Sequence, residues 1–346
     1  LEALAQAPAG TKLVWAVAGG REYPVFIGRG LIGGLPRPGR RAFVVTDEHV
    51  GPLHAPALRD THRTITIAAG EEHKTLAAAE TVWRQLAALG MGRDDHLVAL
   101  GGGVVGDLAG FCAATYQRGV PIVQVPTTVV AQVDSAYGGK TGVDLPEAKN
   151  YVGAYHQPAA VVTDVDMLAT LPSEELAAGY AEVVKTALIA GGSLWERVAA
   201  GAAVDERVVL DCARTKIAVV AADERDGGAR QLLNLGHTVG HAIETVTRYR
   251  RYRHGEAVAL GLLAALRLSG TDELRAQVAE LLAGAGLPTT LEGADPEAVV
   301  AATRLDKKRV GDRVPFVLVR TPGDVRFGQR VAPADVLKAV AELAAG

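Results

Sequence analysis

The sequence lacks several features that mark major protein classes. Only 2 of its 346 residues are cysteine, 5% are aromatic, and 36 Lys and Arg are nearly balanced by 39 Asp and Glu. Two cysteines cannot form a disulfide framework, and the lack of a basic excess argues against a nucleic-acid-binding protein. No apolar run is long enough to span a membrane, and the first residues lack the basic start of a signal peptide. The simplest expectation is a cytoplasmic protein with no membrane or nucleic-acid partner.

The sequence is instead rich in apolar residues and glycine. Hydrophobic residues make up 49% of the chain, and 40 residues are glycine. The high hydrophobic content and the low net charge argue against a disordered protein. A length of 346 residues suggests two domains, or one large one. Three buried strands are expected, at 42–46, 96–100 and 120–125. The helical apolar spacing of 76–89 between the first two predicts a parallel α/β sheet. Helical periodicity predominates from 173 to 282. We therefore expect an α/β domain at 1–170 and a mostly helical domain at 171–346.

A glycine-rich segment follows the second expected strand. Residues 101–107 read GGGVVGD and lead directly into an apolar helical stretch. Backbone N–H groups at such a helix N-terminus attract phosphate, although a tight strand–helix turn would explain the glycines equally well. Thr127 and Thr128 end the next strand, where their hydroxyls could contact the same ligand. Glu71 and Lys74 lie on a charged loop, and a solvent-exposed charge cluster is the alternative interpretation of that loop. Together the three segments predict a dinucleotide site of unusual pattern.

Histidines concentrate in one short segment of the second half. His237 and His241 are four residues apart and share a helix face, and His254 opens the next apolar helix. Imidazoles with one carboxylate are typical ligands of catalytic zinc, whereas capping or core histidines are the alternative. Glu182 lies in an apolar helical stretch three residues before Lys185. It is a candidate for the carboxylate ligand, and a buried ion pair is the competing interpretation.

Cationic side chains next to glycines and polar residues indicate an anionic ligand. Lys140 follows a glycine pair, and Lys149 and Asn150 lie in an expected polar loop. Further cations border apolar segments: Arg118, Lys216, Arg230, Lys307 and Lys308. Each alone reads as an ordinary surface charge. As a group they favour a small phosphorylated or carboxylated substrate.

These motifs, in this order, resemble the 3-dehydroquinate synthase family of the sugar phosphate cyclase superfamily, from about residue 21 to 331. The resemblance implies a Rossmann-like NAD-binding N-terminal domain, a mainly α-helical metal-binding C-terminal domain and a homodimer. The implied cofactors are NAD and a metal ion, normally Zn²⁺, with Co²⁺ as an alternative. The implied metal ligands are Glu182, His237 and His254.

The resemblance also assigns the remaining candidate residues. NAD contacts are implied for Asp47, Glu71, Lys74, Gly103, Val104, Val105, Gly106, Asp107, Thr127, Thr128, Lys140, Lys149 and Thr170. The substrate phosphate is assigned to Lys140, Lys149, Asn150 and one of Lys307 and Lys308, with Arg118 reaching in from the partner subunit. Substrate hydroxyls and carboxylate are assigned to Asp134, Lys185, Lys216, Arg230, Asn234 and His241.

The implied activity converts 3-deoxy-D-arabino-heptulosonate 7-phosphate to 3-dehydroquinate and phosphate in the shikimate pathway. Oxidation by NAD, phosphate elimination, reduction, ring opening and an aldol closure follow one another. Tyr137, Asp144 and His49 depart from the usual family residues, whereas Asn234 and His241 are retained, which favours the seven-carbon acidic substrate. The alternatives are another sugar phosphate cyclase of the amino-dehydroquinate synthase type, a metal-dependent polyol dehydrogenase, or a non-catalytic metal- and nucleotide-binding protein.

Overall fold

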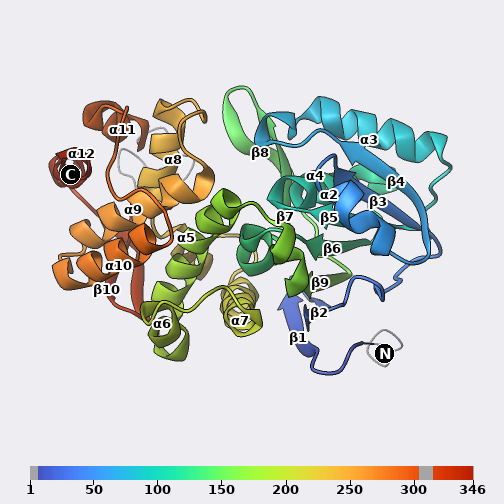
Figure 1. Cartoon of the computed structure of the whole chain (residues 1–346). Helices are drawn as coiled ribbons and strands as arrows, with labels where there is room; N and C mark the ends of the chain where they lie inside the picture. Colours follow the sequence, from blue (N-terminus) through green and yellow to red (C-terminus); the bar gives the residue numbers. More distant parts are fainter. Residues whose placement is uncertain (1–6, 304–314, 346) are drawn as a thin grey trace. The chain divides into compact units, whose positions relative to one another are not determined.

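The computed structural model describes residues 7–303 and 315–345 (Figure 1). The chain divides into two compact units. We call the first the sheet unit; it comprises residues up to Leu171 together with Lys216–Arg225. The second, the helical unit, comprises Pro172–Thr215 and the residues from Asp226 onward. Helix α7 (Glu206–Ala222) begins in the helical unit, and its residues from Lys216 belong to the sheet unit.

The sheet unit is built on a seven-stranded sheet with the order β1-β2-β9-β6-β5-β3-β4. Its strands are β1 (Lys12–Ala18), β2 (Arg21–Gly28), β3 (Ala42–Asp47), β4 (Thr61–Ile67), β5 (His96–Gly101), β6 (Ile122–Pro126) and β9 (Ala160–Asp164). All neighbouring pairs are parallel except β1 and β2, which form an antiparallel hairpin at one edge. The parallel α/β sheet expected from the sequence is therefore confirmed.

The central strands are buried on both faces, as their continuous apolar runs require. Along β3, Phe43 and Val45 point into one hydrophobic cluster and Ala42 and Val44 into another. Helices α3 (Leu76–Ala88) and α4 (Gly103–Thr115) cover the first face (Figure 1). The second face is covered by α2 (Val50–His54) and by the 3₁₀ helices η1 (Ala55–Ala57) and η5 (Val165–Thr170).

A second hairpin packs on α4. It consists of β7 (Lys140–Leu145) and β8 (Ala148–Tyr155), so Lys149 and Asn150 lie in a strand and not in the polar loop expected from the sequence. Gly110 of α4 allows the hairpin to come close, because a Cβ at that position would lie 2.4 Å from Cγ2 of Thr141. Short helical turns complete the unit: η2 (Glu71–His73), η3 (Tyr116–Arg118) and η4 (Ala131–Ser135).

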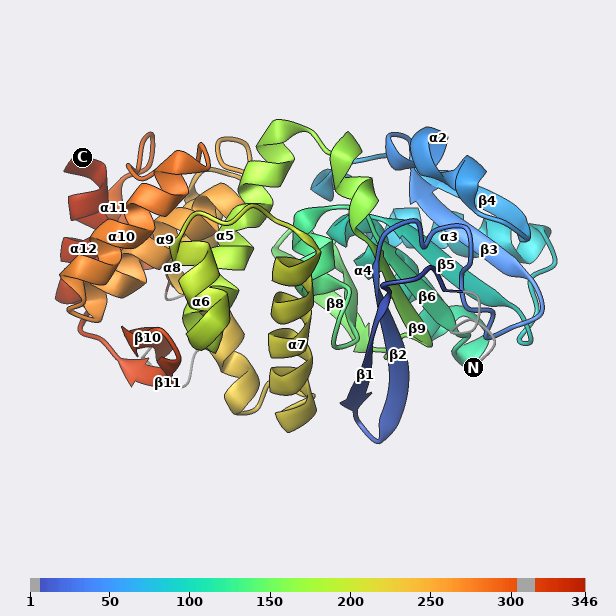
Figure 2. The ribbon, with the colours of Figure 1, turned by 60° about the horizontal axis from the view of Figure 1, so that its bottom comes forward.

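The helical unit surrounds α9 (His254–Leu268), which is buried along most of its length. Figure 2 shows α8 (His237–Val246), α10 (Asp272–Gly284) and α12 (Pro333–Ala345) gathered around it. The other elements are α5 (Ser173–Ala190), α6 (Gly192–Ala199), α11 (Pro296–Thr303), the 3₁₀ helix η6 (Ala229–Asn234), and the hairpin β10 (Pro315–Thr321) and β11 (Asp324–Arg330). The helical character expected for this part of the chain is confirmed. Within the described ranges, no helix is long and apolar enough to cross a membrane.

Two glycines let the neighbouring helices approach α9 at backbone contact. A Cβ at Gly255 would lie 1.8 Å from the carbonyl oxygen of Ala178 on α5, and one at Gly261 would lie 1.9 Å from that of Gly236. Gly236 itself has φ +78°, a conformation that favours glycine, and it precedes the first residue of α8. These contacts hold the beginning of α9 against α5 and the beginning of α8 against the middle of α9. The candidate metal ligands lie on these three helices.

Candidate functional site

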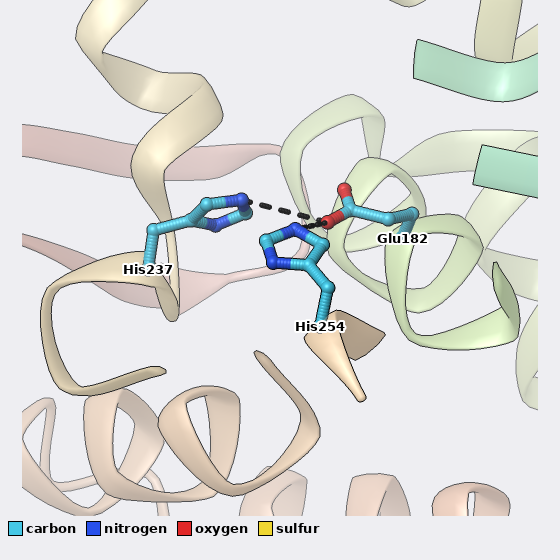
Figure 3. A group of neighbouring side chains, drawn as sticks. All are labelled: Glu182, His237 and His254. Atoms are coloured by element: carbon cyan, nitrogen blue, oxygen red, sulfur yellow. Dashed lines mark ion pairs between the residues drawn. The ribbon is translucent and has the colours of Figure 1, made fainter. Parts of the chain in front are cut away.

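Three helices of the helical unit bring one carboxylate and two imidazoles together. Glu182 is in the middle of α5, His237 is the first residue of α8, and His254 is the first residue of α9 (Figure 3). Oε1 of Glu182 lies 3.5 Å from Nε2 of His237 and 3.3 Å from Nε2 of His254. One ligand atom from each residue lies within 4.8 Å of the others, which is the spacing of a shared metal ion.

The second ring nitrogen of each histidine also has a partner. Nδ1 of His237 lies 3.1 Å from the carbonyl oxygen of Leu235. Nδ1 of His254 lies 3.4 Å from Oε1 of Glu244 on α8. Because a carbonyl or carboxylate oxygen accepts hydrogen bonds, each ring can donate a hydrogen from Nδ1 to its partner, and Nε2 of each ring faces Glu182, where it would be available to a metal ion. This is how metal-binding histidines are normally held.

The electrostatics of the cluster also fit a cation. Burial disfavours ionisation of Glu182, but Lys185 and the imidazoles outweigh burial and hold the pKa of Glu182 well below its usual range. Burial would lower the pKa of His254, yet the carboxylates of Glu182 and Glu244 outweigh it and raise this pKa to about 10. A buried donor set that demands positive charge, composed of one carboxylate and two imidazoles, suits a zinc-like ion. The residues present therefore fit the metal.

The competing interpretation of Glu182 is also correct in part. Its Oε2 forms an ion pair with Nζ of Lys185, and both side chains are fully buried. The ion pair and the histidine contacts engage different oxygens of one carboxylate. A structural ion pair and a metal-ligand geometry thus coexist.

Other predicted residues of the helical unit lie beside this cluster. The rings of His237 and His241 are edge-to-face, with centroids 5.2 Å apart. Asn234, the last residue of η6, lines a small pocket with both histidines, and Arg230 on the same 3₁₀ helix is buried. The hairpin β10–β11 completes the lining with Pro315, Val317 and Gly328.

The sequence interpretation missed these hairpin residues, since none carries reactive chemistry. It also missed Glu244, although the seven-residue spacing from His237 along one helix was an available signal.

In the sheet unit, the glycine-rich segment forms the turn from β5 into α4. Gly101 ends β5, and α4 begins at Gly103 with no described side chain capping its N-terminus. The turn runs against the end of β6: a Cβ at Gly102 would lie 2.9 Å from Cγ2 of Thr128. The hydroxyl of Thr127 is buried and has no hydrogen-bond partner among the described residues. An uncapped helix N-terminus beside an orphaned hydroxyl fits the pyrophosphate of a dinucleotide. The tight-turn explanation also holds, because the glycines are closely packed.

Other candidate NAD contacts lie at the same edge of the sheet. Asp47 ends β3, and its Oδ1 accepts hydrogen bonds from the backbone N–H groups of His49 and Val50 at 2.9 and 2.8 Å. Thr170 ends η5, and its hydroxyl lies 2.9 Å from Nε2 of His54. The strand order reverses direction between β3 and β5, and open α/β sheets bind ligands at the carboxyl ends of strands at such a point.

Lys74 contacts both candidate NAD-binding residues and a candidate phosphate-binding residue. Its ammonium lies 2.6 Å from Oδ1 of Asn150, 2.8 Å from Oδ2 of Asp107 and 3.4 Å from Oε1 of Glu71. Burial opposes its charge, but Asp107 and Glu71 outweigh burial and raise the pKa of Lys74. Glu71 also lies 3.8 Å from Nζ of Lys149. Lys74 is therefore buried and paired with several polar side chains. It is not the solvent-exposed loop cation of the alternative interpretation.

The remaining predicted residues of the sheet unit are on separate elements. Lys140 is exposed at the start of β7, and Arg118 ends η3 with φ +69°. Nζ of Lys216 lies 2.5 Å from Oδ1 of Asp134. Two candidate phosphate ligands lie outside the described residues: Lys307 and Lys308.

Two of the departures from the family pattern have clear structural roles. Asp144 accepts a hydrogen bond from the backbone N–H of Asn150 at 2.6 Å. The hydroxyl of Tyr137 donates to the carbonyl oxygen of Gln132 at 2.7 Å inside the core. Neither replacement removes a candidate ligand.

Known proteins resemble this chain over most of its length. Residues 64–178 match the family described as 3-dehydroquinate synthase N-terminal, and residues 179–309 match 3-dehydroquinate synthase C-terminal. A curated 3-dehydroquinate synthase from Symbiobacterium thermophilum is 45% identical, over 91% of this chain and 96% of its own length. The chain belongs to the 3-dehydroquinate synthase family. The resemblance inferred from the motifs is confirmed.

Two solved structures share the fold of this 3-dehydroquinate synthase family member. 2-Epi-5-epi-valiolone synthase from Streptomyces hygroscopicus subsp. jinggangensis 5008, with NAD⁺ and Zn²⁺ bound, is 26% identical in sequence. The superposition has a TM-score of 0.85 and covers 95% of this chain and 99% of the other chain. A 2-deoxy-scyllo-inosose synthase complexed with carbaglucose-6-phosphate, NAD⁺ and Co²⁺ is 24% identical in sequence. Its TM-score is also 0.85, and the superposition covers 96% of this chain and 100% of the other chain. The predicted dehydroquinate synthase-like fold class is confirmed.

Proposed function

We propose that this chain is a 3-dehydroquinate synthase, a carbon–oxygen lyase that converts 3-deoxy-D-arabino-heptulosonate 7-phosphate to 3-dehydroquinate and phosphate in the shikimate pathway. The observation that carries the proposal is the Glu182–His237–His254 cluster, in a chain 45% identical to a curated enzyme of that name. The uncapped start of α4 beside Thr127 supports NAD as the second cofactor.

The two cofactors and the side chains divide the chemistry. When bound, NAD supplies a reversible hydride acceptor, and Zn²⁺ or Co²⁺ supplies a Lewis acid that lowers the pKa of a substrate hydroxyl. Glu182, His237 and His254 would hold the metal. Oxidation and reduction cancel within one turnover, so phosphate is released without net NADH.

The substrate is held by cations and hydrogen-bond donors. Lys140, Lys149 and Asn150 bind the phosphate, and charge-assisted hydrogen bonds of this kind are about twice as strong as neutral ones. The hydroxyls and carboxylate are held by Asp134, Lys185, Lys216, Arg230, Asn234 and His241. Arg230 is buried, so its guanidinium is well placed to fix a carboxylate in one orientation.

We further propose a cytoplasmic homodimer with domains at 1–170 and 171–346. Arg118 of each chain would serve the substrate phosphate of the other. Its φ of +69° supports a functional role, because backbone strain is concentrated at functional sites. The chain has only two cysteines, Cys112 and Cys212, too few for a disulfide framework, which supports a reducing compartment.

A substrate panel tests the activity. Purified protein loaded with Zn²⁺ or Co²⁺ is given NAD and the seven-carbon sugar acid phosphate, its amino analogue, or glycerol. Phosphate and NADH are followed together. We expect phosphate release with the first substrate and no NADH accumulation. Preference for the amino analogue would indicate the related cyclase, and steady NADH formation from glycerol without phosphate release would indicate a polyol dehydrogenase.

A further inference from the structure

Glu244 is a buried carboxylate that the proposed chemistry does not use. It lies on α8, seven residues after His237, and only 2% of its surface is exposed. A carboxylate is costly to bury unless its charge is used locally, so its position calls for an explanation. Its side chain contacts the ring of His254 across the packed interface of α8 and α9.

The ring of His254 lies between two carboxylates. Its Nε2 is 3.3 Å from Oε1 of Glu182, and its Nδ1 is 3.4 Å from Oε1 of Glu244. Because an ionised carboxylate only accepts, Nδ1 donates its hydrogen to Glu244, and Nε2 would give its lone pair to a metal ion shared with Glu182. Loss of Glu244 would allow the ring to adopt the other tautomer or to rotate.

The two histidines are held differently. Nδ1 of His237 faces the neutral carbonyl of Leu235, whereas Nδ1 of His254 faces the anionic carboxylate of Glu244. A carboxylate partner orients an imidazole and increases its basicity as a ligand, and the loss of such a partner typically weakens metal binding by about 10-fold to 100-fold.

We propose that Glu244 is a positioning residue that fixes the tautomer and orientation of His254 and thereby sets metal affinity. The inference rests on the metal site of the proposed function. A direct role is the alternative, because His241, Glu244 and His254 also lie close enough to share an ion. The positioning role requires weakened binding when Glu244 is changed, and the direct role requires binding to be lost.

Metal binding by the full chain, without substrate, tests the proposal. The variants are Glu244→Gln, which keeps the shape and removes the charge, and Glu244→Ala. Glu280→Gln, an exposed carboxylate on α10, is the matched control. Zn²⁺ affinity is measured by competition with a chromophoric chelator, and the Co²⁺ form is compared by visible absorption. Long-range ¹H–¹⁵N spectra of the Zn²⁺ form report which nitrogen of His254 carries hydrogen.

We expect Glu244→Gln to weaken Zn²⁺ binding by about 10-fold to 100-fold, to keep a Co²⁺ spectrum with altered bands, and to change the His254 signals. Glu280→Gln should match the wild type. Unchanged affinity and spectra in Glu244→Gln would overturn the proposal, as would a loss of binding as complete as in His254→Ala. If Glu244→Ala does not fold, Glu244→Gln alone decides. Phosphate release is assayed separately on the wild type, so failure of the proposed activity is distinguishable from failure of this role.

Discussion

Gly255 on α9 lies so close to Ala178 on α5 that a Cβ at position 255 would be 1.8 Å from the Ala178 carbonyl oxygen. Ala178 is one helical turn before Glu182, and Gly255 directly follows His254. The same backbone contact therefore sets the distance between two candidate metal ligands. Packing of helices and geometry of the site are determined together at this point.

Replacing Gly255 with Ala should disturb both the packing of α5 against α9 and the geometry of the metal site. The new methyl group would force α5 and α9 apart, at a cost of about 1–3 kcal/mol in the free energy of unfolding. We expect a lower melting temperature and Zn²⁺ binding weakened by about tenfold or more, because the carboxylate and imidazole separate. Gly284→Ala is the control, since open space surrounds its Cβ position. Equal Zn²⁺ affinities in the two variants would contradict the coupling.

The buried pair of Glu182 and Lys185 makes a second prediction. In metal-free protein, Glu182→Gln removes the carboxylate from a buried ammonium and should lower the free energy of unfolding by about 3–5 kcal/mol. Adding Lys185→Met should recover most of the lost free energy of unfolding, because the buried ammonium that lost its partner is then removed as well. Urea unfolding in the presence of a chelator measures each step. A double variant that is no more stable than Glu182→Gln would count against the ion pair as the cause.

Much of the fold and the metal cluster could be predicted because the signals are local. Continuous apolar runs indicate buried parallel strands, and three histidines within a short segment stand out in any reading. Glu182 was detectable because a charge in an apolar helix requires a partner.

The rest depends on contacts between segments distant in the sequence. Gly255 and Gly261 look like ordinary helix glycines until α5 and α8 are packed against them. Glu244 gains its role only across the interface of α8 and α9. The strand β8 was missed because its residues alternate irregularly and are partly exposed, so neither strand nor helix periodicity appears.

Lys74 provides a third prediction, on the sheet unit. Its ammonium holds Asp107, a proposed NAD contact, and Asn150, a proposed phosphate contact. Lys74→Met should therefore weaken both NAD and inorganic phosphate binding, each by about 10-fold to 100-fold, as expected for the loss of a charged hydrogen bond. Calorimetric titration of each ligand separately measures the two effects. Arg84→Met, which removes an exposed cation on α3, should change neither. A loss confined to one ligand would show that Lys74 does not link the two sites.

His96 at the start of β5 predicts how stability depends on pH. Burial, assisted by Arg37 and opposed by Asp95, lowers the pKa of His96 to about 4, and the side chain is 1% exposed. Between about pH 4 and 6.5 the unfolded chain binds a proton at this residue that the folded protein does not. Acidification through this range therefore destabilises the fold. The loss is complete near pH 4 and absent above 6.5, and it reaches at most about 3 kcal/mol.

The variant His96→Gln isolates this contribution. Urea unfolding from pH 4 to 7 should show a wild-type free energy of unfolding that falls more steeply on acidification than that of His96→Gln. The two curves should run parallel above pH 6.5, because the histidine is then neutral in both states. His73→Gln, which removes an exposed histidine, should retain the wild-type slope. Parallel curves for wild type and His96→Gln across the whole range would show that burial of His96 does not make folding sensitive to acid.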